Sequence, residues 1–225
     1  MIGEKIKRME KFLVIDCEGH SGLRAYNVGA VVSDNMGIIY AKYSWVLPQA
    51  FAENFQRALS LEKKSPKVGN MMRNNLWYFT DNFGGFDKFV TEEQFTSELR
   101  EICEKYKIKK FWAYNAQFDS KMLAKYTPPY IEWHCIMKLT FPHITTKKYV
   151  RYCEKFNHLT ATGLPSYSAE SVYSYWFNEK TETHRGFEDC VDELAILIKA
   201  KSKKKKQFDS PHWSVLKKIQ QSLSR

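Results

Sequence analysis

Apolar runs in the first fifty residues predict three consecutive strands. The runs are rich in Val, Ile and aromatic residues, and they cover residues 11–18, 24–33 and 38–46. The second and third runs are joined by residues 34–37 (Asp-Asn-Met-Gly), a composition typical of a tight turn. We therefore expect the sheet to begin with antiparallel pairing.

Farther along the chain, predicted strands and helices alternate. Apolar residues at helical spacing predict helices over residues 51–59, 92–106, 146–158, 168–177 and 188–200. Two further apolar runs predict strands over residues 109–114 and 130–136. Strands first and then alternating strands and helices indicate an α/β fold with a mixed central sheet flanked by helices. A chain of 225 residues with 44% hydrophobic content can form one substantial domain, which we place at residues 1–200.

Asp16 and Glu18 end the first predicted strand. Side chains alternate across a strand, so these two carboxylates project from one face while Cys17 points to the other. Two like charges held side by side repel each other unless a proton or a cation lies between them, and a divalent cation prefers such oxygen ligands. A chain with 25 acidic residues also contains Asp-x-Glu by chance, so this short motif is weak alone.

Two more acidic residues lie at the starts of predicted helices. Asp119 is in the first turn of a helix predicted from Phe118 to Tyr126, after the strand at 109–114. Asp189 lies near the start of the helix at 188–200. The predicted apolar face of that helix consists of Val191, Leu194, Ala195 and Ile198. Taken singly, each acid is better explained by the helix dipole, which favours acidic residues in a first turn.

His184 precedes Asp189 by five residues, in a predicted loop. A neutral histidine there can accept a proton near a metal site without being locked to the metal as a ligand. An ordinary surface histidine is the alternative.

Three motifs occur in order across roughly residues 11–199: Asp16-x-Glu18, Asn115-x-x-Phe118-Asp119 and His184-x-x-x-x-Asp189. In order, residue types and spacing they resemble the three motifs of the DEDDh family of 3′-to-5′ exonucleases, which includes proofreading, RNase T, oligoribonuclease and TREX-type enzymes. Two segments differ from the family. Residues 19–23 stand where threonines more often follow the glutamate, and Tyr114 stands where a histidine commonly precedes the asparagine.

The resemblance implies an RNase H-like three-layer fold and a two-metal mechanism. The implied ligands of two Mg²⁺ or Mn²⁺ ions are Asp16, Glu18, Asp119 and Asp189, with His184 as the proton acceptor. The residues implied to hold the terminal nucleotide are Gly19, His20, Asn115 and Phe118.

The expected activity is release of 5′-mononucleotides from a nucleic acid with a free 3′ end. Single-stranded substrates are favoured, and DNA is slightly favoured over RNA. Two alternatives stay open: an exoribonuclease or oligoribonuclease that acts on RNA 3′ ends, and a non-catalytic nucleic-acid-binding protein of the same fold.

Positive charge is concentrated at the end of the chain. Residues 199–225 contain nine Lys or Arg and one Asp, a net charge of +8 out of +10 for the whole chain. We predict a basic tail over residues 201–225 that contacts phosphates independently of sequence, the alternative being a lysine run that only favours solubility. After this run, Ser210-Pro211 and the helical spacing of Trp213, Leu216, Ile219 and Leu223 predict a short amphipathic helix. That helix would dock on its own domain or on a protein partner.

The sequence argues against several other classes of protein. No apolar run approaches the ~20 residues needed to cross a bilayer, and residues 1–11 lack the apolar core of a signal peptide. We therefore expect an intracellular, cytoplasmic protein that is not secreted and has no membrane partner. Five cysteines without a Cys-x-x-Cys pair argue against a disulfide framework and against a zinc site.

Overall fold

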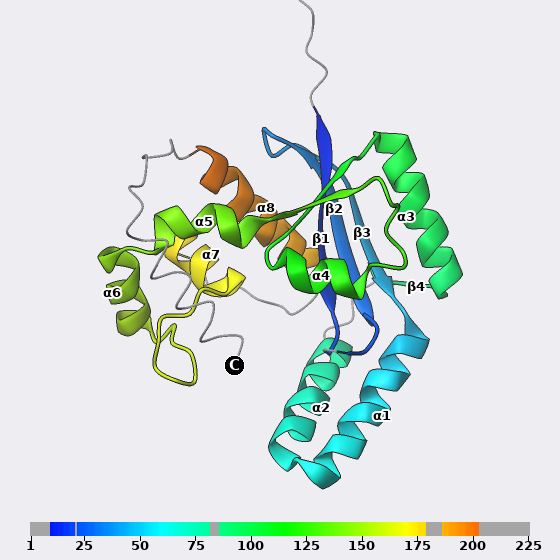
Figure 1. Cartoon of the computed structure of the whole chain (residues 1–225), viewed down its shortest axis with the longest axis horizontal. Helices are drawn as coiled ribbons and strands as arrows, with labels where there is room; N and C mark the ends of the chain where they lie inside the picture. The colour runs from blue at the N-terminus through cyan, green and yellow to red at the C-terminus, as the bar shows by residue number, and fades with distance from the viewer. Residues whose placement is uncertain (1–9, 21, 82–85, 179–185, 203–225) are drawn as a thin grey trace, which may run out of the picture.

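The computed structural model describes residues 10–20, 22–81, 86–178 and 186–202. Within these ranges, a mixed six-stranded sheet has the order β4-β3-β2-β1-β5-β6 (Figure 1). The strands are β1 (Lys11–Glu18), β2 (Asn27–Asp34), β3 (Ile39–Val46), β4 (Lys88–Phe89), β5 (Lys110–Ala113) and β6 (Glu132–Cys135). β1, β2 and β3 pair antiparallel, whereas β4 is parallel to β3, β5 to β1 and β6 to β5.

Helices account for most of the remaining described chain. They are α1 (Pro48–Lys64), α2 (Pro66–Asp81), α3 (Glu92–Tyr106), α4 (Ala116–Met122), α5 (Ile136–Ile144), α6 (Lys147–Phe156), α7 (Ala169–Phe177) and α8 (Gly186–Ser202). Local sequence sets several of the boundaries. For example, Thr91 and Gln94 form a reciprocal capping box at the start of α3, which satisfies two of the free N–H groups there.

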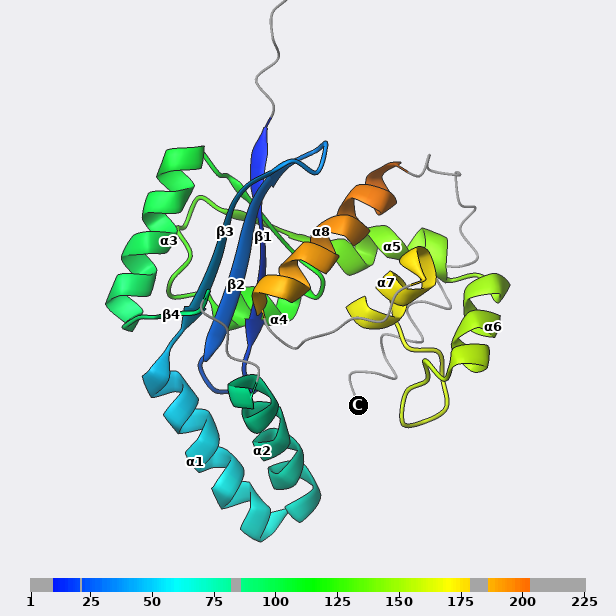
Figure 2. The same ribbon diagram turned by 180° about the vertical axis from the view of Figure 1, so that it is seen from behind.

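The two faces of the sheet belong to separate hydrophobic cores. Leu13, Ile15 and Cys17 of β1 lie in the core that includes residues of α1, α2 and α3. Phe12 and Val14 lie in the core that includes residues of α5, α6, α7 and α8. α8 crosses β1 and β2 on this second face (Figure 2). Because Asp16 and Glu18 continue the alternation of Phe12 and Val14, they lie on the face that α8 covers.

The predicted α/β class, with a mixed sheet flanked by helices, is confirmed. The predicted antiparallel start of the sheet is also confirmed, and Gly37 closes the turn between β2 and β3 with φ +80 while its N–H donates to the Asp34 carbonyl oxygen. The helix predicted at 118–126 is α4, which begins and ends earlier. Three elements were not predicted: α2, β4 and α5. The amphipathic helix predicted after Ser210 lies outside the described residues.

α1 and α2 form a helical hairpin inserted between β3 and β4, and the hairpin extends beyond one end of the sheet (Figures 1 and 2). Its base is tied to the segment between β1 and β2. Arg24 in that segment forms ion pairs with Glu53 of α1 and Glu92 of α3. The buried Asn54 side chain donates to the Arg24 carbonyl oxygen at 3.0 Å. The hairpin is therefore fixed to the chain that directly follows Glu18.

The apolar face predicted for α8 is confirmed only in part: Leu194 is buried and Val191 and Ile198 pack against the second core, but the buried side of the helix is rotated from the predicted one. Of the four residues assigned to it, only Leu194 is buried, while Val191, Ala195 and Ile198 are partly exposed. The buried residues of α8 are Gly186, Asp189, Cys190, Glu193, Leu194, Ile196, Leu197 and Ala200. The face is rotated because two carboxylates, which a hydrophobic pattern counts as solvent-facing, point toward the sheet.

No helix within the described ranges has both the length and the apolar character needed to cross a bilayer. The five cysteines are free thiols.

Candidate metal centre

The end of β1 supplies the first two carboxylates of the site. Asp16 lies opposite Gly29 of β2, and Glu18 lies opposite Asn27. The alternation predicted from sequence holds, because Cys17 between them is buried in the core on the other face of the sheet. Asp16 and Glu18 are partly buried beneath the first turn of α8.

A pair of glycines lets α8 approach β1 and β2 closely enough to deliver the third carboxylate. A Cβ on Gly29 would overlap the backbone of Gly186 and Phe187, and a Cβ on Gly186 would lie 2.6 Å from the Gly29 nitrogen. The buried Asn27 fixes the same contact: its Oδ1 accepts the Gly186 N–H at 2.9 Å, and its Nδ2 donates to the Trp45 carbonyl oxygen at 3.0 Å. The start of α8 is therefore held against the sheet by backbone and amide contacts.

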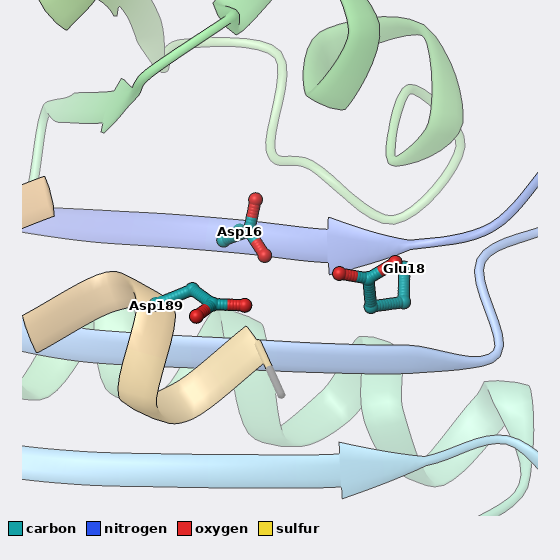
Figure 3. Close-up of side chains that lie close together, drawn as sticks. All are labelled: Asp16, Glu18 and Asp189. Carbon is teal, nitrogen blue, oxygen red and sulfur yellow. The ribbon is translucent and has the colours of Figure 1, made fainter. Parts of the chain in front are cut away.

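Asp16, Glu18 and Asp189 come together at this contact, and we call them the carboxylate triad. One carboxylate oxygen from each residue lies within 4.8 Å of those from the other two, and among the residues that the structure describes they form the only group of this kind suited to a metal ion. Asp189 extends from the first turn of α8 toward Asp16 and Glu18 on β1 (Figure 3). The triad could hold a metal ion, since converging carboxylate oxygens are the ligands that hard divalent cations prefer.

Asp119 lies beside the triad but is not a member of it. β5 is parallel to β1, so the helix that follows β5 begins near the end of β1, and Asp119 is in the first turn of that helix. Asp119 is 2% exposed, and its Oδ1 accepts hydrogen bonds from the Cys17 N–H at 3.2 Å and the Cys17 Sγ at 3.3 Å. Burial raises the pKa of Asp119 to about 6, although the hydrogen bonds from Cys17 act in the opposite direction.

Glu193 is a fifth carboxylate that the sequence motifs did not indicate. It lies one helical turn after Asp189 on α8 and is 3% exposed. Burial raises the pKa of Asp16 well above its ordinary value, and among the neighbouring charges that raise it further Glu193 is the largest, followed by Asp119, Glu18 and Asp189. The spacing of four residues from Asp189 is the feature that could have revealed Glu193, because residues i and i+4 share one face of a helix.

The residues implied to hold a terminal nucleotide are at the same end of the sheet. Gly19 and His20 directly follow Glu18, and the His20 N–H donates to Asn54 Oδ1 of α1 at 3.2 Å. Burial lowers the pKa of His20, and a hydrogen bond to the Met72 backbone opposes that shift. Asn115 is exposed at the start of α4, and Phe118 is partly buried against the first core. His20 thus makes contacts with the α1–α2 hairpin. His184 lies outside the described residues.

Closely spaced carboxylates dominate the chemistry of the site among the residues that the structure describes. Buried like charges raise each other's pKa because ionisation of one disfavours ionisation of the next. At Asp16, desolvation and neighbouring carboxylates both raise the pKa, whereas at Asp119 desolvation is the cause that raises it. Protons or a cation can relieve the repulsion, and at neutral pH a divalent cation neutralises more charge than a single proton.

No family model matches this chain, and no curated protein shows significant similarity to it.

Proposed function

We propose that this protein is a metal-dependent 3′-to-5′ exonuclease with an RNase H-like arrangement, of the DEDDh type. The observation that carries the proposal is the meeting of Asp16 and Glu18 with Asp189, which comes from the other end of the domain, at side-chain oxygen separations within 4.8 Å. Asp119, the fourth carboxylate that the motifs imply, is buried next to them. A sheet that begins with three antiparallel strands and continues with parallel strands on the other side of β1 also supports this arrangement.

Asp16, Glu18, Asp119 and Asp189 would hold two Mg²⁺ or Mn²⁺ ions. Such ions lower the pKa of a bound water and neutralise charge that develops on the scissile phosphate. The protein must hold these carboxylates in place. Asn27 and the close contact of Gly29 with Gly186 hold the start of α8, which carries Asp189. On the α4 side, the hydrogen bonds from Cys17 orient Asp119.

The remaining assignments rest on the motifs. His184 would accept the proton of the attacking water, which requires its neutral form. Gly19, His20, Asn115 and Phe118 would hold the terminal nucleotide. The substrate would be a nucleic acid with a free 3′ end, with single-stranded DNA favoured and RNA as the alternative. Contacts to the 2′-hydroxyl would decide between DNA and RNA.

The test is digestion of matched DNA and RNA oligonucleotides in Mg²⁺ or Mn²⁺, labelled at the 5′ end in one series and at the 3′ end in the other. An exonuclease with the proposed direction converts the 3′ label directly to mononucleotide and shortens the 5′-labelled strand in steps. Asp16→Asn keeps the size and hydrogen-bonding groups of the side chain but removes ligand charge, so activity should fall by orders of magnitude. Glu101→Gln, an exposed position on α3, is the matched control and should retain activity.

Internal cleavage of both substrates, or release from the 5′ end, would contradict the proposed direction. Activity of Asp16→Asn within a few fold of the parent would remove the triad from the mechanism. Binding of oligonucleotides without any cleavage, together with no change of melting temperature in Mg²⁺ or Mn²⁺, would favour the non-catalytic alternative, because a ligand that binds the native state must stabilise it.

A further inference from the structure

One helix far from the triad in sequence order presents a concentrated basic surface. In the ten residues of α6, Lys147, Lys148, Arg151 and Lys155 are all exposed, and Glu154 is the only acidic residue. We call these four cations the α6 basic face. Residues three and four apart share one face of a helix, so the four charges lie along one side over two to three turns.

The opposite side of α6 is already occupied by the protein. Tyr149 and Cys153 are 0% exposed, and the Tyr149 hydroxyl donates to the Ser166 carbonyl oxygen at 2.6 Å. The Tyr152 hydroxyl donates to Ser174 Oγ of α7 at 2.8 Å. The helix is therefore fixed through its apolar side, and its basic side is turned outward.

The four cations of this face outnumber Glu154, the one acid of α6. Among residues that the structure describes, none of the four has a carboxylate within ion-pair distance, whereas Arg24 and Arg73 elsewhere do. Glu154 lies on the same side of the helix, so the face carries four cations and one carboxylate. The excess of closely spaced cations is repulsive, and a polyanion relieves that repulsion.

An aromatic side chain lies at the end of this face. Phe156, the last residue of α6, is 52% exposed, and the Lys155 ammonium lies 5.1 Å from the centre of its ring. Beside it, Tyr152 and His158 stack at a ring separation of 5.5 Å. Cations followed by an exposed ring match a strand that offers phosphates and bases in turn.

We propose that the α6 basic face binds the phosphates of a single-stranded nucleic acid, with Phe156 as a stacking platform for a base. The choice of nucleic acid among polyanions rests on the proposed function. α6 packs on α7, and α7 packs on α8, so this surface belongs to the helices on the same face of the sheet as the triad (Figure 2). A helix that lies on a membrane needs a free apolar side, and the apolar side of α6 is buried, which disfavours an anionic membrane as the partner.

The test measures binding without cleavage. A fluorescent oligothymidylate of roughly 20 nucleotides is titrated with full-length protein in EDTA, at salt concentrations from about 0.05 to about 0.3 M, and affinity is followed by anisotropy. The α6 variant carries Lys147→Gln, Lys148→Gln, Arg151→Gln and Lys155→Gln. The control variant changes four exposed cations of the α1–α2 hairpin by the same net charge: Arg57→Gln, Lys63→Gln, Lys64→Gln and Lys67→Gln. The lysine-rich end of the chain is present in every variant.

Each phosphate contact to a single strand contributes about 0.7 to the slope of log affinity against log salt, so the α6 variant should lose about 2 to 3 from that slope and roughly fivefold in affinity per lost contact at ~0.1 M salt. The hairpin control should lose much less. Phe156→Leu keeps an apolar helix former and should weaken binding several-fold without changing the slope.

Equal losses in the α6 variant and the hairpin control, with circular dichroism showing both folded, would overturn the proposal, because net charge alone would then explain the result. An α6 variant that binds the oligonucleotide like the parent but loses binding to phosphatidylserine vesicles would also overturn it in favour of a membrane. Since EDTA prevents metal-dependent cleavage, these outcomes are independent of whether the triad is catalytic.

Discussion

Replacing Asp119 by asparagine should stabilise the metal-free protein, and the gain should depend on pH. The carboxylate is buried and its pKa is about 6 in the folded protein, against 3.8 as the ordinary value. Each unit of difference corresponds to 1.36 kcal/mol between the two protonation states. Asparagine keeps an oxygen that can accept the Cys17 N–H hydrogen bond but carries no charge.

The raised pKa of Asp119 determines how stability changes with pH. A raised folded pKa means that the folded protein binds the proton more tightly than the unfolded chain, so the wild-type protein loses stability as pH rises from the unfolded pKa through the folded pKa. The loss of folding free energy caused by ionising the buried Asp119 is absent well below pH 3.8. It is about 1 kcal/mol near pH 4.5 and reaches roughly 3 kcal/mol near pH 7.5. Asp119→Asn removes this cost, so its advantage over the parent should grow by about 2 kcal/mol between those two pH values.

Urea denaturation followed by circular dichroism, in EDTA at both pH values, measures the difference directly. Glu101→Gln removes an exposed carboxylate of α3 and should stay within about 0.5 kcal/mol of the parent at each pH. An advantage of Asp119→Asn that is equal at both pH values, or a loss of stability near neutral pH, would refute the reasoning from burial. In saturating Mn²⁺ the order should reverse, because the parent gains binding energy that the variant loses.

Three other changes test how the site is assembled. Gly29→Ala should lower the free energy of unfolding by about 2 kcal/mol or more and reduce the rise of melting temperature in Mn²⁺, because α8 must move away from the sheet. Parent-like values of both quantities would contradict the close contact of α8 with β2. Asn27→Ala removes two buried hydrogen bonds, including that from Gly186, and should cost roughly 2 to 4 kcal/mol in urea denaturation. Glu193→Gln removes the neighbouring charge that has the largest effect on the pKa of Asp16, so the stability of the metal-free protein should fall less steeply as pH rises. A pH dependence of stability equal to the parent's would exclude that coupling between Glu193 and Asp16.

The sequence was most informative where local patterns determine local structure. Alternation along residues 11–18 correctly placed Asp16 and Glu18 on one face and Cys17 on the other, since the side-chain period of a strand is two. The first-turn positions of Asp119 and Asp189 were also predicted correctly, because strand ends and helix starts carry strong composition signals.

Features that depend on contacts between distant segments could not be predicted. α2 mixes polar and apolar residues because part of it packs on α1 and part stays exposed, as Met71 and Trp77 do. α5 contains Pro142, which local propensity treats as a helix breaker. The orientation of α8 depends on the buried Asp189 and Glu193 and on the contact of Gly29 with Gly186, and a hydrophobic pattern encodes neither.

The late position of α8 in the chain has a consequence for how the protein is made. Asp16 and Glu18 belong to β1, which is synthesised before the other described strands, while Asp189 belongs to α8, the last described helix. No chain that ends before Gly186 can contain the triad, however well its sheet has formed. Synthesis runs from the N-terminus at about 5–20 residues per second, so a nascent chain spends roughly 10 to 30 seconds with two of these three carboxylates and without the third. Any cation site that needs all three carboxylates therefore forms only when α8 has been synthesised and has docked on the sheet.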